Sequence, residues 1–455
     1  MKIAILGGGF TGLTASYYLA KKEHRVTLFE KEKVLGGLAV GFKGKGWGWY
    51  LERAYHHLLG SENDILSFAK EIGFEGIFFK ETETASLYET GPVSKFIPTS
   101  ARQEANIARS ARLQEPFLSQ YPFQSNYRIF PVDSPQDFLR FPLLSYPEKI
   151  RAGLVLAFLK ASPFLTLYEK QTAEEFLKKT MGSRVWEVLW QELFRKKFGK
   201  YAENILASFI WARIKKRAKQ LGYISGGFQT LIDFAEGKNK SLGVQINKGF
   251  LVNDLQKRGE KFVINKKEEF DVVISTLPTV IMSKLTQTIF PGSYLQRFSK
   301  MNYLHAVVLI LETKQPILEK TYWLNVCTPK LPLMIVGQHT NFIDKKHYGG
   351  NHIAYVGWYV DRESPMLKMT KEEVLSFCLP HLKKISPNHQ LSTTNYHLFH
   401  GPFAQPIFDK DFVKNKPDFV TPVKNFYIAN LDMTYPYDRG TNYAVKLGRE
   451  ASELI

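Results

Sequence analysis

The sequence is poor in cysteine. Its 455 residues contain only two, Cys327 and Cys378, which stand 51 positions apart. Two cysteines cannot form a disulfide framework or a multi-cysteine metal site, so we expect no metal cofactor. Such scarcity is typical of proteins from a reducing compartment, and we therefore expect a cytoplasmic location.

Long hydrophobic runs are missing as well. The most apolar stretch, residues 152–167, is interrupted by Lys160, Ser162 and Pro163, whereas a membrane-spanning helix needs about 20 predominantly apolar residues. The first apolar run, residues 2–6, ends at once in three glycines, so it does not resemble a cleavable signal peptide. We expect a protein that does not cross a membrane, although it can lie on the inner face of one as a peripheral protein.

Acidic side chains are outnumbered by basic ones, 43 against 61, which gives a formal net charge of +18. Nucleic acid, an anionic membrane surface, a phosphorylated substrate and a Lys-rich proteome would each account for this excess. In contrast, 44% hydrophobic residues exclude a disordered chain. At about 150 residues per domain, the length suggests about three domains.

A nucleotide-binding pattern follows the first predicted strand. The aliphatic run over 2–6 leads into Gly7, Gly9 and Gly12, spaced as Gly-x-Gly-x-x-Gly, and a helix is expected over 13–22. In this order the glycines permit a tight turn, let backbone N–H groups approach a pyrophosphate, and let the helix pack close to the strand. The N-terminus of the helix then faces the phosphate charge.

A second strand, expected over 25–29, ends in an acid. This residue, Glu30, stands 21 positions after Gly9, where a carboxylate accepts hydrogen bonds from a ribose diol. Because the carboxylate would repel a 2′-phosphate, the pattern favours FAD or NAD over NADP. Two adjacent glycines, Gly36 and Gly37, allow another close backbone approach shortly afterwards.

At the Gly-Gly pair the sequence resembles the flavin amine oxidase, protoporphyrinogen oxidase and phytoene desaturase superfamily. It is most similar to a protoporphyrinogen oxidase-like branch from bacteria and archaea, and the resemblance covers nearly the whole chain. The segments that carry it are Tyr55-His56-His57, Trp211-x-Arg213-Ile214-Lys215, Gly226-Gly227-Phe228-Gln229-Thr230-Leu231 and Tyr435-Pro436-x-Asp438-Arg439.

The resemblance implies an α/β fold with a discontinuous, Rossmann-like FAD-binding domain, built on a doubly wound sheet, and an interleaved α+β substrate domain. The FAD-binding domain would comprise residues 1–80, 221–284 and 418–455, and the substrate-binding domain residues 81–220 and 285–417. Residues 88–127 depart from the family, and we interpret them as an insertion. We expect non-covalent FAD, because neither cysteine lies in the C-terminal segment where some amine oxidases attach their flavin.

The predicted FAD contacts combine the glycine-rich turn, the acid and the positions that the resemblance implies. They are Gly7, Gly9, Phe10, Thr11, Gly12, Glu30, Lys31, Gly36, Gly37, Leu38, Val252, Asp432, Arg439 and Asn442. Val252 matches a residue whose backbone meets the adenine, and a helix expected from Asn442 would point its N–H groups at the pyrimidine edge of the flavin. Asp432 stands one position beyond the usual acid, which leaves its contact with the ribityl chain open. Arg439 either holds an anionic group or caps Asp438.

The implied activity is oxidation of a hydrophobic substrate, for example an isoprenoid or a porphyrin-like molecule. FAD would accept a hydride at N5, and dioxygen or another acceptor would reoxidise it. His56 and His57 either take part in substrate binding and proton transfer or simply pack. Arg53 and Trp49 are further candidates on the same approach to the flavin.

Two other functions stay open. The first is a redox-neutral flavoenzyme of the UDP-galactopyranose mutase type, which would act on a sugar nucleotide. The second is a non-catalytic flavoprotein or membrane scaffold. The sequence does not predict an oligomeric state.

Nearly half of the net charge lies in one segment, Arg195 to Lys219, which we call the basic cluster. Its 25 residues hold nine basic side chains and one acidic side chain, Glu203. The cluster is either a solvated helix face or a surface for anionic lipid headgroups or for a phosphate on the substrate. We expect no nucleic acid partner, because aromatic residues do not alternate with the charges as a stacking platform requires.

Overall fold

The computed structural model describes residues 1–90, 126–218, 220–387 and 392–455. Their contacts divide the chain into two compact units, each of which is discontinuous in sequence. Unit 1 comprises Met1–Lys80, Ser208–Leu304 and Gly401–Ile455, and unit 2 comprises Glu81–Ala207 and His305–His400. Within the described ranges, no helix combines the length and apolarity that crossing a bilayer requires.

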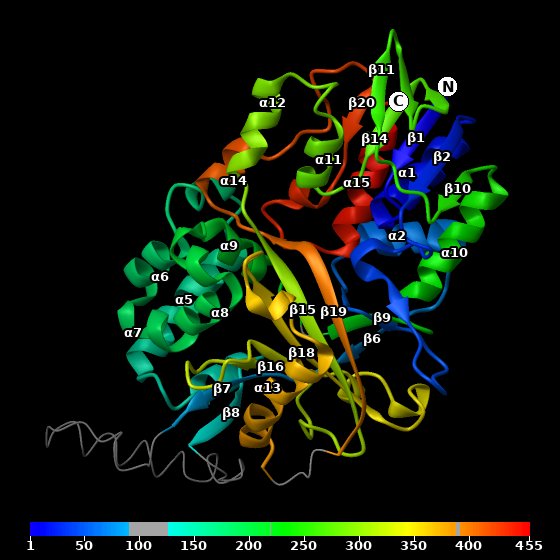
Figure 1. Ribbon diagram of the computed structural model, residues 1–455. Coiled ribbons are helices and arrows are strands. Elements are labelled where there is room, and N and C mark those ends of the chain that lie inside the picture. Colours follow the sequence, from blue (N-terminus) through cyan, green and yellow to red (C-terminus); the bar gives the residue numbers. More distant parts are fainter. Residues whose placement is uncertain (91–125, 219, 388–391) are drawn as a thin grey trace, which may run out of the picture. The chain divides into compact units, whose positions relative to one another are not determined.

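The centre of unit 1 is a five-stranded sheet in which every paired neighbour runs parallel (Figure 1). Its strands, in spatial order, are β10 (Gln245–Lys248), β2 (Arg25–Glu30), β1 (Lys2–Leu6), β14 (Val272–Ser275) and β20 (Phe426–Ile428). The central strands are continuous aliphatic runs because both faces of a parallel sheet are covered. All four residues of β14 are buried, for example.

The helix after β1 packs against a helix from the far end of the sequence. Helix α1 (Phe10–Lys21) begins at the glycine-rich turn, and α15 (Thr441–Glu453) crosses it closely. A Cβ atom on Gly448 would lie only 2.4 Å from the carbonyl oxygen of Thr11. Glycine is therefore required for this approach of the two helices.

Smaller elements complete unit 1. The helices are α2 (Asn63–Ile72), α9 (Ala207–Lys216), α10 (Phe228–Ser241), α11 (Thr279–Leu285), α12 (Gly292–Gln296) and α14 (Lys410–Asn415). The additional strands are β3 (Gly41–Phe42), β4 (Leu51–Glu52), β5 (Leu58–Leu59), β6 (Ile77–Glu81), β9 (Gln220–Ile224), β11 (Leu255–Arg258), β12 (Lys261–Ile264) and β13 (Glu268–Phe270). They form three small sheets: β3 with β4, β5 with β9 and β6, and β11 with β12 and β13.

Unit 2 is built on a seven-stranded sheet. Its order is β19 (Thr393–Pro406), β15 (Tyr303–Thr313), β18 (His352–Val360), β17 (Ile335–Gln338), β16 (Trp323–Val326), β7 (Thr84–Glu89) and β8 (Tyr127–Pro131). Strands β16 and β7 run parallel, whereas the pairs of β15 with β18, β18 with β17, β17 with β16 and β7 with β8 are antiparallel. Two of the four unit boundaries fall inside β15 and β19, and the other two fall near the end of β6 and at the start of α9.

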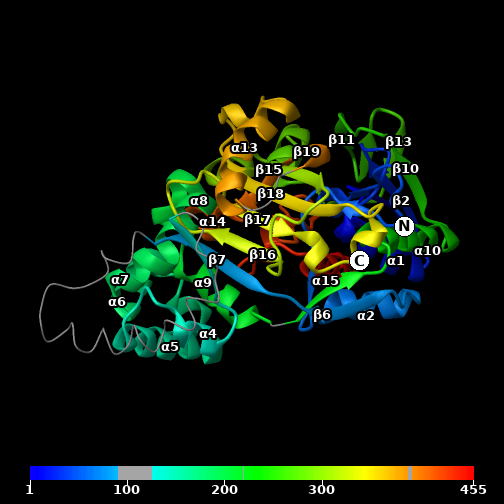
Figure 2. The same cartoon turned by 90° about the horizontal axis from the view of Figure 1, so that it is seen from below.

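Unit 2 also contains helices, most of which lie between β8 and β15 in the sequence. They are α4 (Pro135–Arg140), α5 (Tyr146–Ala161), α6 (Ala173–Met181), α7 (Ser183–Val185), a π-helical turn over Trp186–Gln191, α8 (Glu192–Phe198) and α13 (Lys371–Ile385). Figure 2 shows α4, α5 and α6 side by side, in agreement with their contacts. Capping boxes at Ser145 and Thr172 begin α5 and α6.

The first predicted domain boundary, after residue 80, coincides with a unit boundary, but the next one differs. The sequence predicted a return to the FAD-binding domain at 221, whereas unit 1 resumes at Ser208. Helix α9 belongs to unit 1 because its Trp211 packs against Tyr437, with ring centroids 6.2 Å apart. An aromatic contact with a partner so distant in sequence is not visible in a local pattern.

The predicted boundaries at 284 and 417 also differ from the unit boundaries at 304 and 400. Phe290 packs against Phe426, with ring centroids 4.9 Å apart, and Arg297 donates a hydrogen bond to the carbonyl of Asn415. Both segments therefore belong to unit 1. The predicted insertion over 88–127 lies mostly outside the described residues, and its ends belong to β7 and β8.

Candidate functional site

The glycine-rich turn closes tightly on itself. Gly7 has a φ of +110°, which disfavours other residues, and its N–H donates to the carbonyl of Phe29 at 2.8 Å. A Cβ atom on Gly12 would lie 2.0 Å from the carbonyl oxygen of Gly7. The spacing of these glycines is thus a steric requirement of the turn.

The N-terminus of α1 opens from this turn. Gly9 is its N-cap residue, and no side chain in the described part of the chain caps the helix. Phe10, Thr11 and Gly12, which form the first turn with Leu13, add no negative charge. Unpaired N–H groups at the positive end of a helix dipole form a binding site for an anion such as a pyrophosphate.

Glu30 lies directly beside the turn. Its Oε2 atom accepts a hydrogen bond from the N–H of Gly8 at 2.8 Å, and its Oε1 atom accepts one from the N–H of Glu32 at 2.9 Å. The side chain is buried. The acid predicted from spacing and the glycine turn therefore come together at the carboxyl ends of β1 and β2.

The adjacent glycines Gly36 and Gly37 lie beside the glycine-rich turn. The N–H of Gly36 donates to the carbonyl of Gly8 at 2.9 Å. A Cβ atom on Gly37 would lie 3.4 Å from the Cα atom of Gly9, and Gly37 has a φ of +57°. Gly9 and Gly37 therefore pack backbone against backbone, and together they form a cradle beside the N-terminus of α1.

The remaining residues around Glu30 are more exposed. Lys31 pairs with Glu32 at 3.2 Å, and Leu38 is an exposed hydrophobic residue. The segment that contains Val252 runs alongside them, because the N–H of Phe250 donates to the carbonyl of Glu30 at 2.8 Å. The predicted adenine contact thus lies near the predicted ribose contact.

Asp432 is a buried acid that is only partly satisfied. Its Oδ2 atom accepts hydrogen bonds from the hydroxyls of Thr279 and, at 2.8 Å, Tyr303. Its Oδ1 atom is buried and has no hydrogen-bond partner within the described residues. Burial raises the pKa of Asp432 to about 6, although both hydroxyl donors oppose the shift. The free oxygen is suited to accept a hydrogen bond from a ligand hydroxyl.

Two predicted residues near the start of α15 already have protein partners. Asn442 accepts a hydrogen bond from the N–H of Ile65 at 3.1 Å and donates one to Asp64 at 3.3 Å, so it ties α15 to α2. Arg439 donates to Gln405 at 2.6 Å. It also lies 3.7 Å from Asp438.

The two histidines are partly buried, and both rings are uncharged near neutral pH. Burial lowers the pKa of both His56 and His57 to about 4. The His56 ring shares a 2.7 Å hydrogen bond with the carbonyl of Ala54 and lies 5.5 Å from the ring of Phe228. Nearby, Arg53 is exposed, and Trp49 packs against Phe78, with ring centroids 6.4 Å apart.

The sequence did not predict several buried residues that hold the candidate site residues in position. Glu52 is fully buried and accepts hydrogen bonds from the Tyr223 hydroxyl at 2.6 Å and the Phe228 N–H at 2.7 Å. Thr279 and Tyr303, which hold Asp432, were likewise unforeseen. A local pattern does not identify such contacts, because the partners lie more than a hundred residues apart.

Residues 10–455 match the family described as flavin containing amine oxidoreductase. The chain belongs to this family. It is therefore an FAD-dependent oxidoreductase, as the resemblance predicted. The redox-neutral alternative of the UDP-galactopyranose mutase type is not favoured, because the matched family is one of oxidoreductases.

Relatives of this oxidoreductase support both the family and the fold. The 15-cis-phytoene desaturase of Glycine max is 19% identical over 482 residues, which cover 100% of this chain and 79% of the relative. An oxidoreductase from Methanosarcina mazei has a similar structure, with a TM-score of 0.71, 18% identity and 100% coverage of both chains. A candidate protoporphyrinogen oxidase from Exiguobacterium sp. 255-15 has a TM-score of 0.71 and 15% identity, and covers 100% of this chain and 98% of its own. The predicted fold class is thereby confirmed.

The basic cluster of this flavoprotein is divided between the two units. Arg195, Lys196, Lys197 and Lys200 belong to unit 2, whereas Arg213, Lys215, Lys216 and Arg217 belong to unit 1, and Lys219 lies outside the described residues. Several of these cations have acidic neighbours: Lys200 lies 3.1 Å from Asp361, and Arg213 pairs with Asp438. Because acids lie beside some of these cations, the net positive charge around them is smaller than the number of basic residues in the segment suggests.

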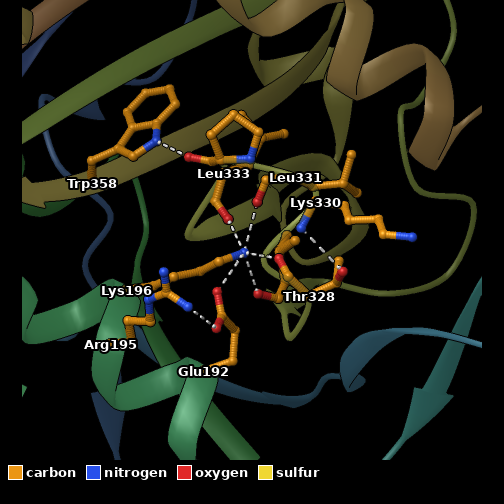
Figure 3. Close-up of polar contacts among 10 residues, drawn as sticks. Glu192, Arg195, Lys196, Thr328, Lys330, Leu331, Leu333 and Trp358 are labelled. Carbon is orange, nitrogen blue, oxygen red and sulfur yellow. Dashed lines mark hydrogen bonds and ion pairs between the residues drawn. The ribbon is translucent and has the colours of Figure 1, made fainter.

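Among the residues of the basic cluster that the structure describes, Lys196 is unlike a solvated surface cation. Its ammonium group points into a ring of four backbone carbonyls, those of Val326, Thr328, Leu331 and Leu333, at 2.7–2.9 Å (Figure 3). Only 11% of the side chain is exposed, and Glu192 lies 3.8 Å away. Burial lowers the pKa of Lys196 to about 8, opposed by Glu192, so the ammonium form predominates at pH 7. The residue ties α8 to the loop between β16 and β17.

Proposed function

We propose that this protein binds FAD without a covalent bond and uses it to oxidise a hydrophobic substrate. FAD supplies the acceptor for a hydride taken from a C–H or N–H bond. The observation that carries the proposal is the cradle of Gly9 and Gly37, which meet backbone to backbone beside the glycine-rich turn and the buried carboxylate of Glu30.

The residues fit the chemical parts of FAD. The N-terminus of α1 and the cradle suit a pyrophosphate, Glu30 suits a ribose diol, and the backbone near Val252 suits an adenine. The free Oδ1 atom of Asp432 suits a hydroxyl of the ribityl chain, although the acid is displaced by one position in the sequence. The N–H groups that begin α15 would face the pyrimidine edge.

Two observations support a hydrophobic substrate and a dissociable flavin. The relative that matches the whole chain is named a phytoene desaturase. Both cysteines lie in unit 2, whereas the flavin attachment found in some amine oxidases uses a C-terminal segment. The neutral imidazoles of His56 and His57, together with Arg53, remain our candidates for contacts with the substrate.

The first test is the absorption spectrum of the purified protein. We expect the visible bands of an oxidised flavin, and after acid precipitation we expect the flavin in the supernatant. A colourless protein that takes up no added FAD would contradict the proposal, and flavin retained in the precipitate would contradict non-covalent binding.

A substitution at the turn tests where FAD binds. Gly12→Ala places a methyl group 2.0 Å from the Gly7 carbonyl oxygen, so we expect loss of nearly all bound flavin. The matched control is Gly153→Ala in α5, where the added atom meets nothing within 4 Å. Equal flavin content in the two purified variants would place the cofactor elsewhere.

The anionic membrane partner remains a proposal as well. Lys215, Lys216 and Arg217 of the basic cluster support it through their charge, although Lys215 lies over the ring of Trp211 and Lys216 over that of Tyr437. Neutralising these three residues is expected to weaken salt-sensitive binding to anionic vesicles. If the neutralised variant binds as well as the wild type, these three residues are part of a solvated face and do not bind the membrane.

A further inference from the structure

Helix α5 carries a stripe of exposed apolar side chains. Tyr146, Ile150, Leu154 and Phe158 are 51%, 59%, 69% and 56% exposed. Their spacing of four residues aligns them along one side of the helix. Residues of this kind are normally buried, so a continuous row on a well-formed helix calls for a partner.

The stripe extends beyond the helix at both ends. Leu139 at the end of α4 is exposed, and so are Phe164 and Leu167 after α5. We call the seven residues Leu139, Tyr146, Ile150, Leu154, Phe158, Phe164 and Leu167 the apolar face. The opposite side of α5 packs normally, since Ala152 and Leu159 are completely buried. The exposure is therefore directional and does not reflect a helix that lacks a core contact.

Within the chain segment that carries most of the apolar face, the exposed charges have one sign. Between residues 145 and 170, all of which the structure describes, the exposed charged residues are Arg151, Lys160 and Lys170. The two acids in this stretch, Glu148 and Glu169, are only partly exposed. Glu148 also accepts hydrogen bonds from Ser145 at 2.7 Å in the capping box of α5. A row of apolar side chains in a segment whose exposed charges are all cations matches the surface of an anionic bilayer.

The length of the helix indicates how it would lie. Helix α5 has 16 residues, too few to cross a bilayer. An amphipathic helix of this length lies in the plane of the interface, with its apolar side among the upper acyl chains and its cations at the headgroups. The phenol ring of Tyr146, at one end of the stripe, is of the type enriched at that level.

We propose that the apolar face is a membrane-docking surface that inserts into the interfacial layer of an anionic lipid bilayer. The charge complementarity selects a bilayer over a second copy of this chain, because two copies of the face would bring like charges together. The inference uses only side chains of unit 2 and does not depend on the FAD site. It also differs from docking through the basic cluster, which involves other residues.

The test compares vesicle binding of matched double variants of the full chain. Vesicles of neutral phosphatidylcholine and vesicles in which about a third of the lipid is anionic are sedimented with the protein. The variant Ile150→Ser with Leu154→Ser is expected to reduce partitioning by about tenfold or more, since it removes two insertion points. The control, Val420→Ser with Leu454→Ser, alters two exposed apolar residues of unit 1 and should bind as the wild type does.

A fluorescent label reports insertion directly. Burial raises the pKa of the thiols of Cys327 and Cys378 to about 12, so an added exposed cysteine can be labelled selectively. An environment-sensitive dye on Leu154→Cys should shift to shorter wavelength when anionic vesicles are added. The same dye on Val420→Cys should not shift.

Several results would overturn the proposal. These are unchanged vesicle binding by the Ile150→Ser and Leu154→Ser variant, absence of wild-type binding to either vesicle, and a dye shift without lipid that grows with protein concentration. The last would indicate a second copy on the face. Loss of binding only when Lys215, Lys216 and Arg217 are neutralised would assign docking to the basic cluster. The flavin spectrum of each variant is recorded in parallel, so that failure of the FAD proposal is recognised separately.

Discussion

Charged side chains are usually exposed and apolar side chains are usually buried, and two helices of unit 2 each break one half of this rule. Helix α8 buries the cation of Lys196, and α5 exposes Leu154 and its neighbours. The cation is compensated within the protein by four carbonyls, whereas the exposed apolar side chains have no comparable compensation. A buried charge with a full set of partners indicates a structural role, and an exposed apolar row indicates a partner outside the chain.

Substitution of the buried cation should have the largest effect. Lys196→Met leaves four buried carbonyls without their donor, so we expect a loss of about 3–5 kcal/mol in the free energy of unfolding. Its control is Arg195→Met on the preceding residue, whose side chain is 70% exposed, with a change within about 0.5 kcal/mol. Denaturant unfolding of the FAD-bound chain measures both. Equal stabilities would show that the carbonyl ring does not need the ammonium group.

The second prediction separates the two sides of α5. Leu159→Ala removes a completely buried side chain and should cost about 2–5 kcal/mol. Leu154→Ala, five residues earlier on the exposed side, should change stability by no more than about 0.5 kcal/mol without lipid. Thermal unfolding distinguishes the two, and a large loss for Leu154→Ala would mean that the apolar face is covered within the protein.

A third prediction asks whether a buried acid in unit 1 is as well compensated as Lys196. Burial raises the pKa of Glu52 from its ordinary value of 4.5 to about 7. Between these values the folded state binds more protons than the unfolded state, so this residue makes stability fall as the pH rises from 4.5 to 7. Glu52→Gln should remove about 1–3 kcal/mol of that fall.

The measurement for Glu52 is the unfolding free energy at several pH values across this range. The matched control is Glu260→Gln, which alters an exposed acid of unit 1 and should keep the wild-type dependence on pH. Parallel curves for the Glu52→Gln variant and the wild type would mean that Glu52 is ionised in the folded state throughout.

The parts of the site that sequence predicted are those in which steric needs act over a few residues. Gly7 and Gly12 meet each other within one turn, and Glu30 follows at a spacing fixed by one helix and one strand. These constraints leave a pattern that one sequence displays. The fold class followed from the same pattern and the resemblance it revealed.

What the sequence did not predict depends on partners distant in the chain. Lys196 counted as one of nine surface cations, because its carbonyl partners lie more than a hundred residues away. The apolar stretch that includes α5 was recognised, but the exposed side could not be known before α4 and α6 were in position. The unit boundary at Ser208 depends on the ring of Tyr437 in the same way.

The close crossing of α1 and α15 at Gly448 has a consequence for biogenesis. During translation the glycine-rich turn emerges among the first residues, whereas β20 and α15 emerge only after both segments that form unit 2. Until then the sheet lacks an edge strand, and α1 exposes the surface that α15 later covers. We therefore expect the flavin to be loaded late, because a ribosome that stalls inside unit 2 leaves a nascent chain that holds the glycine-rich turn without β20 and α15.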